Sequence, residues 1–149
     1  MKLRNYQDIV ALEQSIPDPL AGQSNTYAMI QAGAAINPSA PALSFFLRTE
    51  NHHRPATWTY AEWLSDITRT ANMLHRLGLK KGEVVAFVLP NLPETHLAIW
   101  GGETAGIAFA VNTLLDGDQM GELLAAANTR WLITTGPFPD REVWTRVEA

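Results

Sequence analysis

Short apolar runs rich in β-branched residues recur through the second half of the chain. They occupy Glu83–Leu89, Ile107–Val111 and Arg130–Thr134. None alternates apolar with polar residues as a half-solvated strand does, and this is the pattern of a strand covered on both faces. We therefore expect three buried strands.

The segment between the first two strands predicts a helix. Asn91 or Leu92 suits the N-cap, Pro93 the first helical position, and Glu94 the positive end of the helix. Gly106 marks its end. Two strands joined by a helix form a βαβ unit, whose strands are parallel and whose crossover is right-handed.

A second helix is expected after a loop at Asn112–Gly117. Asp116 or Asp118 suits its cap, and it should run to about Asn128. Its inward residues should be Met120, Leu123, Leu124 and Ala127. The order β-α-β-α-β predicts an α/β fold: a doubly wound, mainly parallel sheet with helices on both faces. Asp140–Val147 again has helical character.

The clearest helix signal lies upstream of the sheet. Thr59 and Glu62 form a capping box, in which each side chain reaches the backbone amide of the other residue. An apolar stripe then repeats at three- and four-residue spacing, through Leu64, Ile67, Ala71, Leu74 and Leu77. Gly78 followed by Leu79 suits a left-handed helix end with an apolar contact onto the last turn.

Two smaller elements precede this helix. Asn25 or Thr26 suits the cap of a short helix through about Ala34, with Tyr27, Ile30 and Ala34 on one face. Ala42–Arg48 and Ala56–Thr59 predict a short hairpin joined by the polar segment Thr49–Pro55.

The first residues carry weaker signals. Asp8–Gln14 suits one or two helical turns, and Pro17-Asp18-Pro19 would end any helix there. We expect an N-terminal arm at residues 1–24 and the main body, a partial domain, at residues 25–149.

Composition narrows the function classes. A chain of 149 residues with 46% hydrophobic residues suits one globular domain. The formal net charge of -4, without a basic stripe, argues against nucleic-acid binding. No apolar run approaches the roughly 20 residues of a membrane span, and the N-terminus lacks the apolar centre of a signal peptide. The absence of cysteine excludes disulfides and thiolate metal sites and leaves the redox compartment undetermined. We expect a cytoplasmic protein as the default.

Candidate chemistry is sparse. His52-His53 lies in the hairpin loop without a third ligand in helical spacing, so a solvated loop is favoured over a metal site. Asp116, Asp118 and Glu122 resemble a weak metal site, but acidic residues in a first helical turn are common for electrostatic reasons alone. His75 and His96 lie in predicted helices without a spaced partner.

The stretch Thr134–Pro137 most resembles an anion-binding loop, although it lacks a lysine and a plain strand exit explains it better. No Rossmann glycine fingerprint, nucleophile elbow, zinc-protease motif or Gly-Lys-Ser/Thr phosphate loop is present. Gly101, Gly102 and Gly106 are better explained by close helix–sheet packing. We therefore assign no catalytic, cofactor-binding or metal-binding residue to this span.

A resemblance rests on six short motifs in a fixed order. They are Pro41–Leu43, Thr57–Glu62, Leu77–Ala86, Leu89–Glu94, Ala105-Gly106 and Leu132–Thr134. Together they resemble the opening part of AMP-forming acyl-CoA synthetases, the adenylate-forming ligases that include coumarate ligases, luciferases and peptide-synthetase adenylation domains. No single motif is diagnostic, but six in order are hard to obtain by chance. The resemblance covers about Asn25–Gly136.

The resemblance implies a large N-terminal domain that binds ATP, magnesium and a fatty or other carboxylic acid. It also implies transfer of the acyl group to coenzyme A. The family's phosphate loop, ribose-binding aspartate, hinge and catalytic lysine all come later in its sequences, so no functional residue can be transferred here. Many members carry a proline before Asn112, where this chain has Val111. Arg141 is the one candidate for a coenzyme A contact, and a weak one.

The resemblance therefore implies an N-terminal portion of such an enzyme, inactive alone, that binds none of these cofactors by itself. The alternative is a short non-catalytic relative that acts as a binding or assembly module. A free dinucleotide-binding domain is disfavoured by the missing glycine fingerprint. Because a partial sheet leaves an unpaired edge, we expect the isolated chain to form a homodimer or a strand-exchanged oligomer when the remainder of the enzyme is absent.

Overall fold

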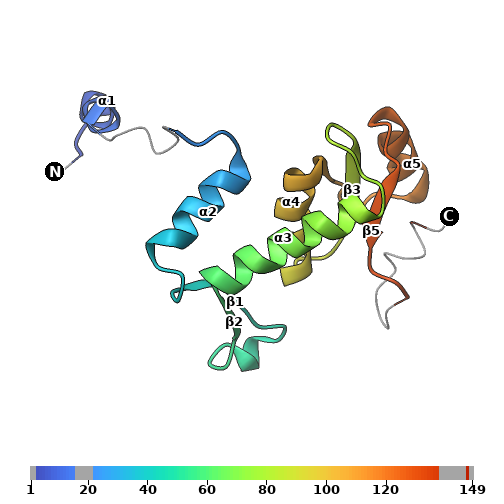
Figure 1. Cartoon of the computed structure of the whole chain (residues 1–149), viewed down its shortest axis with the longest axis horizontal. Helices are drawn as coiled ribbons and strands as arrows, with labels where there is room; N and C mark the ends of the chain where they lie inside the picture. The colour runs from blue at the N-terminus through green and yellow to red at the C-terminus, as the bar shows by residue number, and fades with distance from the viewer. Residues whose placement is uncertain (1–2, 16–21, 138–146, 148–149) are drawn as a thin grey trace.

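A three-stranded parallel sheet with helices around it forms the main body of the fold (Figure 1). The computed structural model describes residues 3–15, 22–137 and 147. In chain order the elements are α1 (Tyr6–Ser15), α2 (Thr26–Ile36), β1 (Pro41–Phe45), a 3₁₀ turn (Thr49–Asn51), β2 (Ala56–Thr59), α3 (Tyr60–Arg76), β3 (Val84–Val88), α4 (Pro93–Ala105), β4 (Ile107–Ala110), α5 (Gly117–Ala126) and β5 (Trp131–Thr134).

The sheet has the order β4-β3-β5, and both pairings are parallel. Val85, in the central strand, lies beside Ala108 on one side and Trp131 on the other. The α4 helix connects β3 to the parallel strand β4, as the βαβ prediction required. The helix begins after Leu92 as its N-cap and has Pro93 in its first turn.

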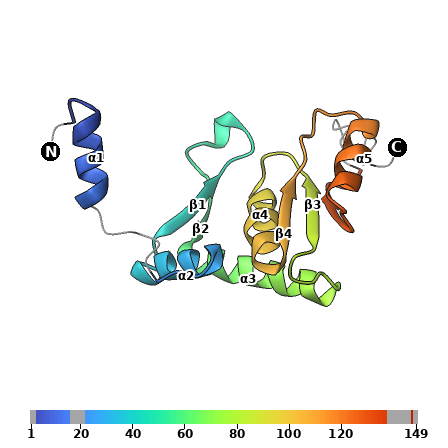
Figure 2. The same ribbon diagram turned by 90° about the horizontal axis from the view of Figure 1, so that it is seen from above.

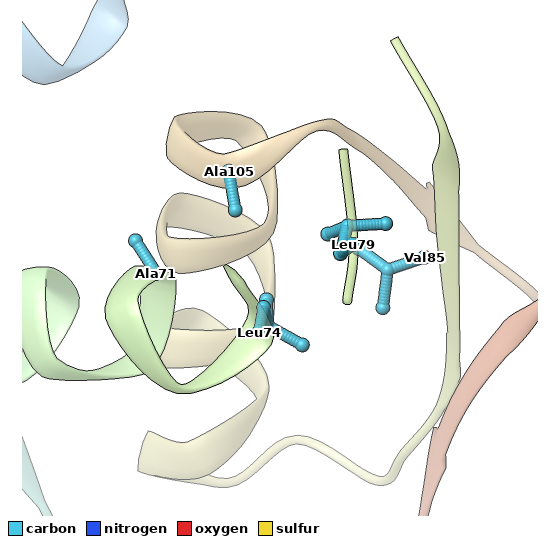
Figure 3. Packing of buried hydrophobic residues seen from close by; sticks show 5 residues of the cluster. All are labelled: Ala71, Leu74, Leu79, Val85 and Ala105. Carbon is cyan, nitrogen blue, oxygen red and sulfur yellow. The ribbon is translucent and has the colours of Figure 1, made fainter. Parts of the chain in front are cut away.

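Helices cover both faces of this sheet, which confirms the predicted fold class (Figure 2). On one face, Val85 packs with residues of α3, α4 and the turn after α3: Ala71, Leu74, Leu79 and Ala105 (Figure 3). On the other face, Ala86 and Val88 pack with Val111 and with Met120 of α5. Alternate side chains of β3 therefore serve two separate clusters, because successive residues of a strand point to opposite faces.

Two of the three strands are less buried than their apolar sequences predict. In β3, Val85, Ala86 and Val88 have no exposed surface, whereas Ile107 in β4 is 50% exposed and Leu132 in β5 is 38% exposed. The prediction of three fully buried strands is therefore wrong for β4 and β5. The physical reason is their position: each has a neighbouring strand on one side only among the described residues.

The α3 helix has both predicted end structures. The Thr59 amide donates to Glu62 Oε2 at 2.8 Å, and the Glu62 amide donates to Thr59 Oγ1 at 3.3 Å. The Thr59 hydroxyl also donates to Glu62 Oε2 at 2.8 Å. The two hydrogen bonds that the Thr59 amide and hydroxyl donate to this carboxylate hold the pKa of Glu62 below its ordinary value. At the other end Gly78 has φ +104°, and the Leu79 amide donates to the Leu74 carbonyl at 3.0 Å. This is a Schellman end, with Leu79 buried against Leu74.

The predicted inward face of α3 needs two corrections, one at each end of the helix. Leu77 is 55% exposed, while Trp63 is only 8% exposed and joins Ile67, Ala71 and Leu74 in the buried row. Trp63 lies one turn before Ile67, so it continues the row toward the N-terminus. Leu77 is the C-cap residue, and the turn at Gly78 places Leu79 inside instead.

The α5 helix begins as expected and packs less completely. Asp116 is its cap, because its Oδ1 accepts from the Gln119 amide at 2.9 Å. Met120 is buried and Leu124 packs beside it, but Leu123 is exposed, contrary to the prediction. Helix α5 has one buried row, because it meets the sheet along one side only. The helix ends two residues before Asn128, which has φ +48°.

The hairpin and α2 lie at the N-terminal end of α3. Strands β1 and β2 are antiparallel, although β1 ends three residues earlier than predicted. Asn25 caps α2 through its Oδ1, which accepts from the Ala28 amide at 2.8 Å. Tyr27 Oη lies 2.8 Å from Thr68 Oγ1, and this hydrogen bond ties α2 to α3.

The predicted helical turns at Asp8–Gln14 belong to the longer helix α1, which buries no side chain. The predicted division between residues 24 and 25 stays a prediction. Three predictions lie outside the described residues: the helix end at Pro17-Asp18-Pro19, the weak candidate Arg141, and the helix at Asp140–Val147, of which only Val147 is described. In the part of the chain that the structure describes, every helix is too short or too polar to cross a bilayer.

Candidate functional site

The carboxyl ends of the three parallel strands meet at one edge of the sheet, where doubly wound folds bind their ligands. Three connections leave this edge: Leu89–Leu92 after β3, Val111–Asp116 after β4, and Thr135–Pro137 after β5. This edge is therefore the first place to look for a reaction centre.

Three polar side chains at this edge form hydrogen bonds within their own loops. Thr95 Oγ1 donates to the Pro90 carbonyl, and Asn112 Oδ1 accepts from the Leu114 amide at 3.0 Å. Thr134 Oγ1 donates to the Thr135 carbonyl at 3.4 Å. These bonds shape the loops. The segment predicted to resemble an anion-binding loop lies at this edge as a simple exit from β5.

The charges needed to hold a phosphate are not supplied by these loops. Neither Leu89–Leu92 nor Val111–Leu115 nor Thr135–Pro137 contains a lysine or an arginine. Phosphate sites in nucleotide-binding proteins combine backbone amides with such a cation. The described parts of these loops therefore lack the positively charged side chains that would neutralise the phosphates of a nucleotide.

The four histidines lie in three separate parts of the structure. His52 and His53 form an edge-to-face pair with ring centroids 5.5 Å apart in the exposed hairpin loop, and His52 Nδ1 lies 2.9 Å from the Thr49 carbonyl. His75 Nδ1 lies 3.0 Å from the Leu79 carbonyl, in the Schellman turn. Among the described residues, no three His, Asp or Glu side chains are grouped closely enough to hold a metal ion.

Asp116 and Asp118, two of the three residues of the predicted weak metal site, have structural roles at the start of α5. Asp116 accepts the Gln119 amide, and the Gln119 side chain returns a hydrogen bond to the Asp116 amide at 3.3 Å. Asp118 lies in the first turn of α5, where the helix dipole favours a negative charge.

An aromatic cluster at the junction of β2, α3 and α4 was not anticipated from the sequence. Trp58 and Trp63 have ring centroids 6.0 Å apart, and Trp63 lies 6.5 Å from His96, both pairs edge-to-face. Extending the α3 stripe by one turn would have placed Trp63 inside. The other two residues come from different elements, and their local sequence contained no signal of the contact.

Glycines allow α4 to approach its neighbours closely. A Cβ atom on Gly102 would lie 3.1 Å from Ala108 Cβ, so the predicted helix–sheet packing is confirmed there. A Cβ on Gly101 would instead lie 2.5 Å from Thr70 Cγ2, on α3. A Cβ on Gly106 would meet the Glu83 carbonyl at 2.5 Å. These three glycines therefore serve close packing.

The fold and this edge define a class: part of a doubly wound α/β domain. A family model described as AMP-binding enzyme matches residues 30–148. Because that match spans most of the chain, the chain belongs to the AMP-binding enzyme family. The resemblance found in the sequence motifs is thereby confirmed.

Curated relatives include CoA ligases. The chain is 29% identical over 136 residues to the marinolic acid–CoA ligase of a Pseudoalteromonas species, which covers 91% of this chain and 21% of the relative. It is 34% identical over 83 residues to the crotonobetaine/carnitine–CoA ligase of Salmonella paratyphi A, covering 54% of this chain and 16% of the relative. The chain thus spans about a fifth of the length of these relatives.

Solved structures share the fold. The inhibitor-bound N-terminal domain of FACL13 from Mycobacterium tuberculosis matches with a TM-score of 0.67 at 24% identity, over 84% of this chain and 30% of that chain. The O-succinylbenzoate coenzyme A synthetase of Bacillus subtilis, in complex with ATP and a magnesium ion, matches with a TM-score of 0.66 at 22% identity, over 77% of this chain and 29% of that chain. At these identities the likeness concerns the fold alone.

Proposed function

We propose that this chain is the N-terminal framework of an AMP-forming acid–CoA ligase. The full-length enzyme would activate a fatty or other carboxylic acid with ATP and magnesium, then pass the acyl group to coenzyme A. The observation that carries this proposal is the family match over residues 30–148, together with relatives that are themselves CoA ligases.

In this proposal the nucleotide-binding groups come from outside this span. The described residues do not fit ATP and magnesium on their own, because the loops at the carboxyl edge of the sheet carry no lysine or arginine. Thr95, Asn112 and Thr134 are engaged in local hydrogen bonds there, and no group of three metal-ligating side chains occurs among the described residues. We therefore derive no catalytic step through these residues.

The test is acid-dependent ATP–pyrophosphate exchange. The purified chain should give no exchange above the buffer background with acetate, medium-chain or aromatic acids. The full-length marinolic acid–CoA ligase, assayed with its own acid, provides the positive control. Clear exchange by the 149 residues alone would refute the claim that the reacting groups lie elsewhere.

A second candidate is a non-catalytic module that works by association. It is favoured by the half-exposed strands β4 and β5, which leave apolar side chains and strand edges open among the described residues. For the isolated chain we propose a homodimer or strand-exchanged oligomer. Sedimentation at rising concentration tests this, and a strictly monomeric profile would contradict it.

A further inference from the structure

Two polar side-chain atoms at the start of β5 are buried without a hydrogen-bond partner among the described residues. They are the hydroxyl oxygen Oγ1 of Thr129 and the indole nitrogen Nε1 of Trp131. A buried polar group that lacks a partner is destabilising, and the large majority of such groups in folded proteins bond to protein atoms or to ordered water. These two atoms therefore require a partner.

The two residues are close together at the amino edge of the sheet. Trp131 is the first residue of β5 and lies two residues after Thr129. Trp131 packs against the buried cluster that contains Leu79 and Val85 (Figure 3). Side chains two residues apart along an extended chain point to the same face of a sheet, so Thr129 also belongs to this side.

The indole ring lies against the turn that ends α3. A Cβ atom on Gly78 would lie 3.5 Å from Trp131 Cζ2, a ring carbon that is two bonds away from Nε1. Gly78 has φ +104° and lies in the Schellman turn. The indole N–H is thus enclosed between the start of β5 and the end of α3.

A carboxylate lies at the same place. Val85 is the register partner of Trp131, so counting back two residues on each chain places Glu83 opposite Thr129. Glu83 Oε1 lies 3.5 Å from Nη1 of Arg130, the residue between Thr129 and Trp131. The side chain of Glu83 therefore reaches the start of β5. A carboxylate has about four acceptor positions, so this contact leaves it able to accept further hydrogen bonds.

The chemistry of these three groups fits a water molecule. An indole N–H can only donate, a carboxylate can only accept, and a threonine hydroxyl can do both. A cation cannot accept from the indole of Trp131, and an anion would be repelled by the charge of Glu83. A water molecule can accept from the indole and donate to the two oxygens. Internal water molecules typically make about three hydrogen bonds to buried polar groups.

We propose that one internal water molecule binds at the amino edge of the sheet, between Thr129, Trp131 and Glu83. It accepts a hydrogen bond from Trp131 Nε1–H and donates to Thr129 Oγ1 and to the Glu83 carboxylate. The water joins the connection from α5 to β5 with the connection from α3 to β3. It lies at the edge opposite the loops that follow the strands, so this inference is independent of the proposed function.

The first experiment detects the water by NMR of the isotope-labelled full chain. The Trp131 indole proton is identified by its contact with the Gly78 α protons and by its loss in Trp131→Phe. We expect a cross-peak from this proton to the water resonance with the sign of a long-lived bound water. Thr129→Val should lose the cross-peak, and the matched variant Thr129→Ser, which keeps a hydroxyl, should retain it. Absence of the cross-peak in the unaltered chain, or its full strength in Thr129→Val, would overturn the proposal.

The second experiment is a double-mutant cycle in urea unfolding, because a threonine hydroxyl exchanges its own proton with solvent and can relay the NMR signal. Trp131→Phe and Thr129→Val should each lower the urea midpoint. The double variant should unfold close to the less stable single variant, because the first substitution already removes the water.

Two results of the cycle would overturn the proposal. A higher midpoint for Trp131→Phe than for the unaltered chain would mean that the indole N–H is buried without any partner. Strictly additive losses would mean that Thr129 and Trp131 share no water molecule. Far-UV circular dichroism verifies that each variant is folded. Should a variant not fold, the cross-peak of the unaltered chain decides.

Discussion

The contact between α3 and α4 at Gly101 supports a quantitative prediction. A Cβ atom at this position would lie 2.5 Å from Thr70 Cγ2, 2.7 Å from Thr70 Cβ and 3.4 Å from the Ala71 amide nitrogen. Carbon atoms in ordinary contact are about 3.5–4.0 Å apart. The substitution Gly101→Ala therefore requires the two helices to separate by roughly 1 Å. Rotation of the Thr70 side chain cannot relieve the contact with Thr70 Cβ.

Two effects of opposite sign decide the outcome. Alanine in the middle of a helix is favoured over glycine by about 0.5–1 kcal/mol. Overpacking of a close contact costs about 1–3 kcal/mol. On the other side of α4, Gly102 contacts Val85 and Ala108, so a shift of the helix also disturbs its fit on the sheet. We expect Gly101→Ala to lower the free energy of unfolding by about 1–2 kcal/mol.

The assay is urea unfolding followed by tryptophan fluorescence at a fixed protein concentration. Gly121→Ala is the matched control, because Gly121 lies inside α5 with no atom within 4 Å of a built Cβ. That variant should gain about 0.5–1 kcal/mol. Thr70→Gly removes both clashing atoms, so the double variant with Gly101→Ala should show a favourable coupling energy. Stabilisation of Gly101→Ala equal to that of Gly121→Ala would refute the close approach.

Three further predictions concern the helix ends and the core. Ile67→Ala, at a fully buried position, should cost about 2–5 kcal/mol in urea unfolding, while Leu77→Ala at the exposed C-cap should stay within about 0.5 kcal/mol; equal losses would contradict the corrected inward face. Asn128 has φ +48°, a left-handed conformation that glycine adopts easily and alanine does not. Asn128→Ala should therefore lower the free energy of unfolding by about 1 kcal/mol, and Asn128→Gly should not. Thermal unfolding of both variants tests this. Hydrogen bonds from Thr59 lower the pKa of Glu62, so the folded state favours the ionised carboxylate. The contribution of this carboxylate to the free energy of unfolding should be complete above the unfolded pKa of about 4.3. It should decline as the pH falls through the pKa of the folded state. Glu62→Gln should remove that part of the acid dependence, and an unchanged pH profile would argue against the capping box.

Local elements were predictable because their causes lie within a few residues. The Thr59–Glu62 capping box, the Gly78 turn and Pro93 at the start of α4 each depend on hydrogen bonds or backbone angles inside one short segment. The order of alternating strands and helices followed from apolar periodicity, and with it the doubly wound class. The six ordered motifs added the family, which no single local pattern could supply.

The sequence assigned no phosphate-binding group at the carboxyl edge of the sheet, because Leu89–Leu92, Val111–Asp116 and Thr135–Pro137 contain no lysine or arginine. The contact of Trp63 with Trp58 and His96 was not predictable, because it joins three elements whose relative positions depend on the packing of α3 against α4.

The sequence by itself determined which segments become helices and strands, because periodicity and capping act between residues that are close along the chain. Only the tertiary structure decided which of those segments are buried. The runs at β3, β4 and β5 are similarly apolar. Within the described part of the chain only β3 has a strand on each side, so Val85 is enclosed while Ile107 and Leu132 remain partly exposed. Burial depends on neighbours that are distant in sequence, so the exposure of Ile107 and Leu132 could not be predicted from their own apolar runs.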